Sequence, residues 1–160
     1  MRHPICIFVM SVLTLNALTS ALAKGKTVSE VPRVASATIT SPLNSSVVAK
    51  KAIASGECSP SAAGDIWVFV WPERSPGWGY PQSPNSYPAS CKNEQWKTPI
   101  FLQGEPQPFE IAVYVATAAA SAVIKDFLRK GARSNNYPGM HRDLLPDGLV
   151  DQQRVRVTKP

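Results

Sequence analysis

The residues best suited to binding another molecule lie in one short stretch. Residues 71–82 read W-P-E-R-S-P-G-W-G-Y-P-Q, which places two tryptophans, one tyrosine, three prolines and two glycines in twelve positions. Trp78 and Tyr80 are the candidate ligand contacts, Trp78 being the stronger, because aromatic side chains on a loop stiffened by proline can stack on sugar rings or anchor a protein partner. The alternative is that the stretch covers the end of the protein's own core, since large aromatic side chains are more often buried than exposed.

The other polar residues do not indicate a catalytic centre. Beyond residue 23 the chain has one histidine, His141, in a segment rich in proline and glycine, where an isolated histidine is usually a solvated side chain. Asp143, Asp147 and Asp151 stand where turn chemistry already favours aspartate, so they do not predict the carboxylate pair of a glycosidase. The sequence contains no His-Glu-x-x-His, no glycine-rich phosphate loop and no Cys-x-x-Cys. We therefore predict no catalytic residue, no metal ligand and no cofactor, and a hydrolase is only the most distant alternative.

The first 23 residues have the pattern of a secretory signal peptide. Arg2 provides a basic start, residues 5–13 are mostly apolar, and Ala21-Leu22-Ala23 has the small residues of a cleavage site. Polar residues interrupt the apolar stretch, which is shorter than the roughly 20 residues that a membrane-spanning helix needs. The sequence therefore predicts cleavage after Ala23, no membrane span after that cleavage, and a secreted or periplasmic location.

Three cysteines are present, and the predicted compartment decides how they are used. Cys6 lies in the predicted signal peptide and is removed with it. Cys58 and Cys91 remain, and two leftover thiols in an oxidising compartment pair most simply with each other. We predict a disulfide between Cys58 and Cys91 rather than a metal site, because two cysteines and His141 supply too few ligands.

The length and charge of the mature chain suit one small domain. Residues 24–160 are enough for a single domain with its own core. The formal net charge of the whole chain is +6, and its basic residues are scattered apart from a group at 125–133. A modest and scattered excess does not indicate a nucleic-acid-binding protein, and a secreted location argues further against one.

Hydrophobic patterning predicts a short lead, several strands and one helix. Residues 24–36 are polar and irregular and are predicted to be a flexible lead. The helix is predicted over 117–130, where Thr117 can cap the start and Gly131 suits the left-handed position after the end. Strands are predicted at 37–40, 47–55, 66–71, 96–102, 109–115 and 153–158, with loops at 71–91 and 132–149.

The order of these elements predicts the fold. The stretch 66–71 is apolar throughout and fits a central strand covered on both faces, whereas 109–115 alternates and places Phe109 and Ile111 on one face. Six or seven short strands, with a single helix inserted before the last strand, indicate an all-β protein built as a two-sheet sandwich over residues 37–160.

Several landmarks, in this order, resemble those of secreted bacterial immunoglobulin-like modules. They are Ile39-Thr40-Ser41-Pro42 with Asn44, Val48, Gly56, Ile66-Trp67-Val68 with Val70 and Pro72, Tyr80-Pro81-Gln82, and Trp96. The similarity runs over residues 37–158. It implies an immunoglobulin-like β-sandwich without an active site, of the kind that serves as an accessory domain for adhesion, ligand contact or spacing. The chain departs from the antibody pattern, since Cys58 and Cys91 fall beyond the ends of the predicted strands and a helix precedes the last strand.

These observations predict a non-catalytic binding module that is secreted or periplasmic and contacts a protein of the envelope or of the extracellular space. The alternative is a carbohydrate-binding module in which Trp78 and Tyr80 stack on a saccharide. Neither prediction involves nucleic acid or a cofactor.

Overall fold

The chain is described by a computed structural model over residues 36–59, 64–83 and 85–160. The predicted signal peptide, 1–23, lies outside the described residues, as does nearly all of the predicted lead, so both stay predictions. Within the described part, no helix is long and apolar enough to cross a membrane.

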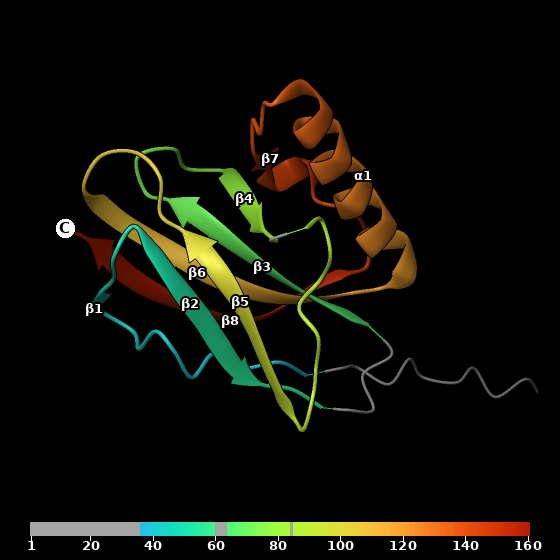
Figure 1. The fold of residues 1–160 in the computed structure, drawn as a ribbon, viewed down its shortest axis with the longest axis horizontal. Helices are drawn as coiled ribbons and strands as arrows, with labels where there is room; N and C mark the ends of the chain where they lie inside the picture. Colours follow the sequence, from blue (N-terminus) through green and yellow to red (C-terminus); the bar gives the residue numbers. More distant parts are fainter. Residues whose placement is uncertain (1–35, 60–63, 84) are drawn as a thin grey trace, which may run out of the picture. The chain divides into compact units, whose positions relative to one another are not determined.

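Two β-sheets and one α-helix make up the described part of the chain (Figure 1). The larger sheet has the strand order β1-β8-β6-β3-β4-β7, and the smaller sheet consists of β2 and β5. Paired strands are antiparallel, except that β1 runs parallel to β8. The elements are β1 (Ser46–Val47), β2 (Lys51–Glu57), β3 (Asp65–Pro72), β4 (Trp78–Gln82), β5 (Gln95–Phe101), β6 (Gln107–Ala116), α1 (Ala118–Ser134), β7 (Met140–His141), a 3-10 turn (Arg142–Leu144) and β8 (Leu149–Lys159).

The larger sheet is covered on both faces. Val68 and Ile111 belong to the core between this sheet and β2 and β5, whereas Phe69 and Ala112 belong to the core beneath α1. Alternation along β3 and β6 produces this division, because successive side chains of a strand point to opposite faces. The prediction that 66–71 is a central strand buried on both faces is confirmed.

The fold is an immunoglobulin-like β-sandwich with one helix inserted before the last strand, as the sequence predicts. In chain order and pairing, β2 and β5 take the places of strands B and E, and β3, β6 and β8 take those of strands C, F and G. The helix follows β6 and lies over the outer face of the larger sheet (Figure 1).

The first described segment joins the two sheets. Backbone hydrogen bonds, such as the one of 2.9 Å from the N–H of Thr38 to the carbonyl of Glu57, align residues 37–41 with β2. β1 then pairs with β8 of the other sheet. The sequence predicts a strand over 47–55 that is irregular around 50 and 51, and the structure has two strands there, because the chain changes sheets between β1 and β2.

The stretch 71–82 is not one loop, which corrects the sequence prediction. β3 continues to Pro72, the chain turns through 73–77, and β4 returns antiparallel to β3. The turn uses Gly77 at a φ of +89°, a value that glycine reaches without steric cost. Pro81 is compatible with β4 because this strand pairs with β7 only at its first two residues, so Pro81 stands on a free edge within the described part.

Helix α1 starts where the sequence predicts and ends later. The side chain of Thr117 accepts the backbone N–H of Ala120, which confirms its capping role. Gly131 lies inside the helix, so its predicted place after the helix end is wrong, and Asn135 takes the left-handed position with a φ of 49°. Tertiary packing explains the glycine at this position, because a Cβ on residue 131 would lie 2.7 Å from the ring of Tyr137.

Cys58 and Cys91 form the predicted disulfide, with their Cα atoms 6.0 Å apart. Cys58 follows β2 directly and Cys91 precedes β5, so the bond joins segments beside two paired strands of one sheet. Antibody domains instead join their two sheets with a disulfide, which is the departure that the sequence indicates.

Candidate functional site

A groove lies at the free edge of β4, between the end of β5 and the last turns of α1. It has a volume of about 1080 Å³, and we call it the β4 groove. Its lining residues come from β3, β4, the loop after β4, the end of β5 with the turn that follows, and the chain around the end of α1. They are Val70, Pro72, Ser75, Tyr80, Pro81, Gln82, Ser83, Asn85, Ser86, Phe101, Gln103, Gly104, Gln107, Phe109, Phe127, Leu128, Ala132, Asn135, Asn136, Tyr137 and Gly139.

The described lining of the β4 groove contains no charged side chain, although two cations lie beside it: the ammonium of Lys51 is 5.8 Å from the centre of the Phe101 ring, and Lys159 donates to the carbonyl of Gly104. None of the described residues that line the groove is Asp, Glu, Lys, Arg or His, although 18% of the chain consists of charged residues. Aromatic rings, side-chain amides and hydroxyl groups take their place. Ligand sites usually combine apolar and aromatic walls with a few polar groups that orient the ligand, and the β4 groove has this composition.

Four aromatic side chains of the groove keep accessible surface, and one of them is the half-buried Phe127 of α1. Phe101 ends β5 with 39% of its surface exposed, and Tyr137 follows α1 with 50% exposed. Tyr80 is half-buried, and its ring lies beside Gly139, where a Cβ would come within 3.1 Å of it. The ring of Tyr137 packs on Gly131 in the same way. Each tyrosine is therefore positioned by a glycine that has no side chain to displace it.

One side-chain amide of the groove holds the sandwich together. Gln82 is buried, its Nε2 donates to the carbonyl of Tyr80 at 2.8 Å, and its Oε1 accepts the backbone N–H of Phe101 at 2.8 Å. This side chain ties the free edge of β4 to the end of β5 in the other sheet. Gln82 is therefore a structural residue.

Other amides of the groove are exposed and unbonded. An amide side chain has two donor hydrogens and a carbonyl acceptor, so it can bind any hydroxyl or peptide group. The exposed amides that bond to no residue in the described ranges are those of Asn85, Gln103, Asn135 and Asn136. They are available to a molecule from outside.

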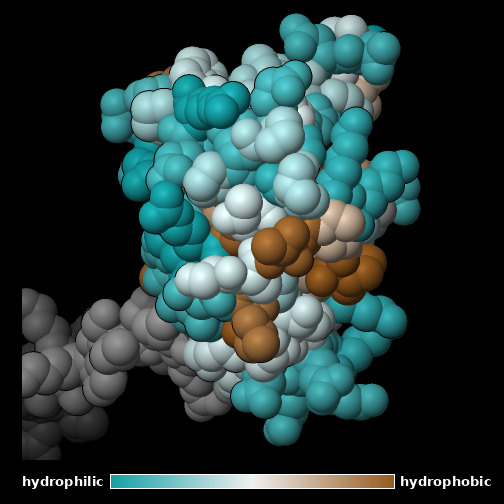
Figure 2. Space-filling view, turned by 90° about the vertical axis from the view of Figure 1, so that its left-hand side faces the viewer, coloured by the Kyte–Doolittle hydropathy of each residue, from teal (hydrophilic) through white to brown (hydrophobic). Residues whose placement is uncertain are grey.

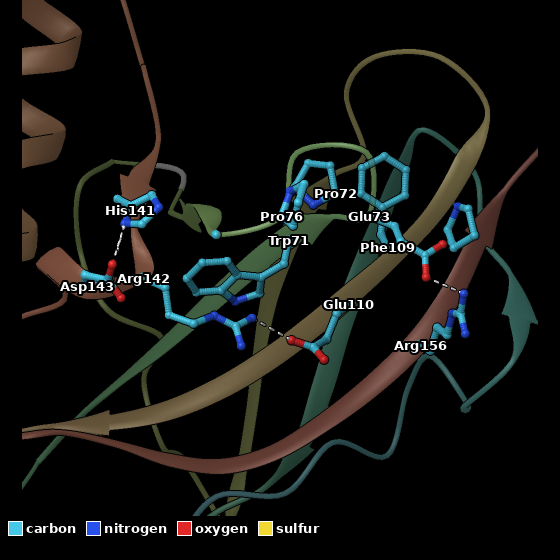
Figure 3. A pocket seen from close by; sticks show the side chains of 12 residues that line it. Trp71, Pro72, Glu73, Pro76, Phe109, Glu110, His141, Arg142, Asp143 and Arg156 are labelled. Carbon is cyan, nitrogen blue, oxygen red and sulfur yellow. Dashed lines mark hydrogen bonds and ion pairs between the residues drawn. The ribbon is translucent and has the colours of Figure 1, made fainter.

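A second hollow, shown in Figure 3, has the opposite character, and we call it the charged pocket. Its volume is about 490 Å³. It is lined by Trp71, Pro72, Glu73, Pro76, Gly77, Pro108, Phe109, Glu110, His141, Arg142, Asp143 and Arg156. The charged side chains contact one another in the pairs Arg156–Glu73 and Arg142–Glu110 at 3.5 Å, and the imidazole of His141 lies 3.4 Å from the carboxylate of Asp143.

Trp71 forms a buried wall of the charged pocket. It is 4% exposed, and the guanidinium carbon of Arg142 lies 4.7 Å from the centre of its ring (Figure 3). A cation over an aromatic face is attracted by the partial negative charge of that face. The indole N–H is buried and has no hydrogen-bond partner in the described part of the chain. Arg142 thus covers Trp71, and the protein's own residues occupy this contact.

The ion pairs of the charged pocket continue across the larger sheet. Glu110 is shared by Arg142 and Arg154, and Arg154 donates to the hydroxyl oxygen of Tyr114 at 3.0 Å. Burial raises the pKa of Tyr114 to about 12, and the positive charge of Arg154 opposes part of this rise. The network links β6, β8 and the 3-10 turn, so it stabilises the position of β7 against the sheet.

His141 and Asp143 share the charged pocket with the carboxylates of Glu73 and Glu110. None of the described residues that line this pocket is Ser, Thr, Cys, Lys or Tyr. The described ranges also contain no group of three His, Cys, Asp or Glu side chains that could hold a metal ion.

The two contacts predicted from the sequence lie in different surroundings. Tyr80 lines the β4 groove. Trp78 is 41% exposed, and its ring meets that of His141 edge to face at a centroid distance of 5.2 Å. Trp78 lines neither of the two hollows. Whether either side chain contacts a ligand stays a prediction.

Phe101, Tyr137 and the exposed amides are not among the ligand contacts predicted from the sequence. Phe101 is one position of an alternating strand, and Tyr137 stands in a Tyr-Pro-Gly turn signal. The run Asn135-Asn136-Tyr137, with two amides beside an aromatic ring, is the local signal that points to the groove.

The surface around β1 offers less to a ligand. Figure 2 faces the side of the molecule where β1 lies and shows a small group of hydrophobic side chains on a largely hydrophilic surface. Leu43 precedes β1 and Val47 ends it, and they are 72% and 71% exposed. Exposed apolar side chains in small numbers are normal on protein surfaces.

No protein-family model matches the chain, and no curated protein sequence is significantly similar to it. The candidate site therefore rests on the geometry of the chain itself.

Proposed function

We propose that this chain is a non-catalytic binding module whose ligand occupies the β4 groove. The observation that carries the proposal is the combination, in one groove, of exposed aromatic rings with amides that bond to nothing in the described part of the chain. In the free protein, water satisfies these groups. A ligand that matches both the rings and the amides displaces that water and gains affinity from both.

The stability of the fold does not account for these residues. Gln82 already makes the bonds that tie β4 to β5, whereas Gln103 and Asn136 add no bond to the described residues. Tyr137 packs on Gly131 yet leaves half of its surface exposed. Side chains that neither pack fully nor pair within the fold are free to contact a partner.

An oxidising location supports the same proposal. The disulfide between Cys58 and Cys91 is of the kind that forms and persists outside the cytosol, and the predicted signal peptide would bring the chain there. In a secreted or periplasmic setting, the partner of a binding module is a component of the cell envelope or of the extracellular space.

Capture of native material tests the proposal. The full chain is expressed with its own leader, purified after export, and mixed with the envelope fraction and the extracellular polymer of the cells that produce it. The bound fraction is measured after sedimentation. Tyr137→Ala is expected to weaken binding about tenfold, because this side chain exposes half of its surface in the groove.

Trp78→Ala is the matched control. It removes an exposed aromatic side chain that lies outside the groove, so capture should be nearly unchanged. Equal capture of the wild type and Tyr137→Ala, or a loss confined to Trp78→Ala, would show that the ligand does not occupy the β4 groove.

A further inference from the structure

We infer that the ligand of the β4 groove is a neutral oligosaccharide, an inference that rests on the proposed binding function. Charge is the first argument. A charged ligand that enters the groove loses hydration, and none of the described lining residues carries an opposite charge to compensate for that loss. The groove therefore favours an uncharged ligand in a protein whose formal net charge is +6.

The aromatic rings provide the second argument. Tyr80, Phe101 and Tyr137 come from three separate elements and line one groove. The face of an aromatic ring carries partial negative charge, and it therefore attracts the C–H groups on the face of a sugar ring. The tyrosine hydroxyls add polar groups at the ends of these rings, so each ring suits a ligand that is apolar on one face and polar at its rim.

The exposed amides provide the third argument. Each sugar hydroxyl both donates and accepts a hydrogen bond, and an amide side chain does the same. Gln103 stands beyond the end of β5, while Asn135 and Asn136 follow α1, so these three amides come from two walls of the groove. A ligand with hydroxyl groups at several positions around its rim matches this arrangement.

The free edge of β4 argues against an extended peptide. A peptide that adds to a sheet edge needs the N–H and C=O groups of the edge strand. Pro81 is the residue of β4 whose backbone faces the free edge, and it has no N–H to offer to such a peptide. Main-chain pairing of a peptide along β4 is therefore poorly supported.

The volume of the groove sets the size of the ligand. At about 1080 Å³ the groove lies at the upper end of the roughly 300–1,000 Å³ that small-molecule sites occupy. Three aromatic rings from different elements also give more than one stacking position. Several linked sugar rings suit this groove better than a single sugar.

Calorimetry with defined sugars tests the inference. The probes are cellohexaose, maltohexaose, mannohexaose, xylohexaose and the chitin hexamer, with hexagalacturonic acid as the charged comparison. At least one neutral probe is expected to bind, with an affinity that does not change with salt, because no charges attract each other. The charged comparison should bind at least about tenfold more weakly.

Variants connect this binding to the groove. Tyr137→Ala is expected to weaken it about tenfold and Gln103→Ala about threefold, whereas Trp78→Ala should leave it within about twofold of the wild type. Gln103 is exposed and makes no bond to the described residues, so its variant keeps the experiment informative even if Tyr137→Ala fails to fold. Circular dichroism spectra confirm that each variant is folded.

Treatment of the captured envelope material separates this inference from the proposed function. Periodate cleaves sugar rings that carry vicinal diols, and mild acid hydrolysis cleaves the glycosidic bonds of saccharides that lack them. One of the two treatments should abolish Tyr137-dependent capture, also when the right sugar is missing from the probes, whereas protease digestion should leave capture intact. Capture that depends on Tyr137 but survives both periodate and acid hydrolysis, together with no binding to the probes, overturns the saccharide while the binding module stands. Capture that does not depend on Tyr137 overturns both.

Discussion

The β4 groove and the charged pocket differ in how their polar groups are satisfied, although one segment lines both. Residues 135–139 contribute to the β4 groove, and residues 141–143, directly after them, contribute to the charged pocket. In the charged pocket the acidic and basic side chains contact one another. In the groove, the exposed amides make no hydrogen bond to the described part of the chain.

Two different costs explain this difference. A partly buried charge loses hydration and is stable only when an opposite charge or a set of hydrogen bonds replaces the water. An exposed amide keeps its water and needs no partner within the protein. The charged pocket looks more like an active site in composition, yet the groove has the free groups that a ligand requires. The number of polar side chains in a hollow and their bonding state are therefore separate properties: the charged pocket has the charged groups, and the groove has the amides that make no bond to the described residues.

Removal of Trp71 should have the largest effect on stability. This side chain is 4% exposed, stacks near Phe69 with ring centroids 5.9 Å apart, and is covered by Arg142. Trp71→Ala should therefore lower the free energy of unfolding by about 3–5 kcal/mol, measured by urea unfolding. Tyr137→Ala should lower it by less than about 1 kcal/mol, since that side chain is half exposed. Similar losses in both variants would contradict the assignment of one hollow to structure and the other to binding.

Loss of the disulfide should have the next largest effect and leave the groove unchanged. The bond spans a sequence separation of 33 residues, so the double variant Cys58→Ser with Cys91→Ser should lose about 3–4 kcal/mol of stability in the chain-entropy model. Cys91 precedes β5 whereas Phe101 ends it, so the affinity of the folded variant for its ligand should equal that of the wild type. Thermal unfolding and the capture assay measure the two quantities. If the double variant folds but binds its ligand more weakly, the geometry of the groove depends on the disulfide at the other end of β5.

Alkaline pH should lower the stability of the folded protein through Tyr114. Tyr114 has a pKa of about 12 in the folded protein and the ordinary value of 10.0 in the unfolded chain. Its contribution is complete below pH 10. Between these two values the unfolded chain has lost a proton that the folded protein keeps, so the free energy of unfolding falls as pH rises, by roughly 2–3 kcal/mol at pH 12.

Tyr114→Phe isolates the contribution of this hydroxyl group to the pH dependence of stability. The variant should show a smaller fall in the free energy of unfolding between pH 10 and 12, measured by urea unfolding at each pH. Tyr137→Phe is the matched control, because its hydroxyl belongs to an exposed side chain of the groove, and its stability should fall with pH as in the wild type. Parallel pH profiles for the wild type and Tyr114→Phe would contradict the assigned role of Tyr114.

Gly131→Ala should have a smaller effect on stability than loss of Trp71 or of the disulfide, and a visible effect on the groove. Alanine normally favours a helix over glycine, but the added Cβ would lie 2.7 Å from the ring of Tyr137 and 2.9 Å from the carbonyl oxygen of Asn136. Overpacking against the backbone should make the net change a loss of about 1–2 kcal/mol. Displacement of Tyr137 should also weaken ligand binding, which calorimetry measures. A gain in stability with unchanged binding would show that Tyr137 moves freely and is not positioned by Gly131.

Several parts of the molecule could be predicted because neighbouring residues specify them. The apolar run at 66–71, the alternation along β6 and the cap at Thr117 are local patterns, and the structure confirms each. β4 was missed because proline and glycine usually indicate loops. Here prolines and glycines occur both in the turn at 73–77 and on the edge strand β4. Only the pairing of β4 with β3 shows which of these residues belong to the turn and which to the strand.

The sequence by itself determined the class of fold, the cysteine pairing and the start of the helix, since these follow from periodicity, from counting and from the chemistry of single side chains. Tertiary structure alone decided where α1 ends, that Tyr80 and Trp78 face different surroundings, and which polar groups stay free. The physical reason is that the β4 groove combines residues from 70 to 139, which meet only when the two sheets and the helix pack. No local pattern in the sequence indicates which side chains remain without a hydrogen-bond partner after that packing.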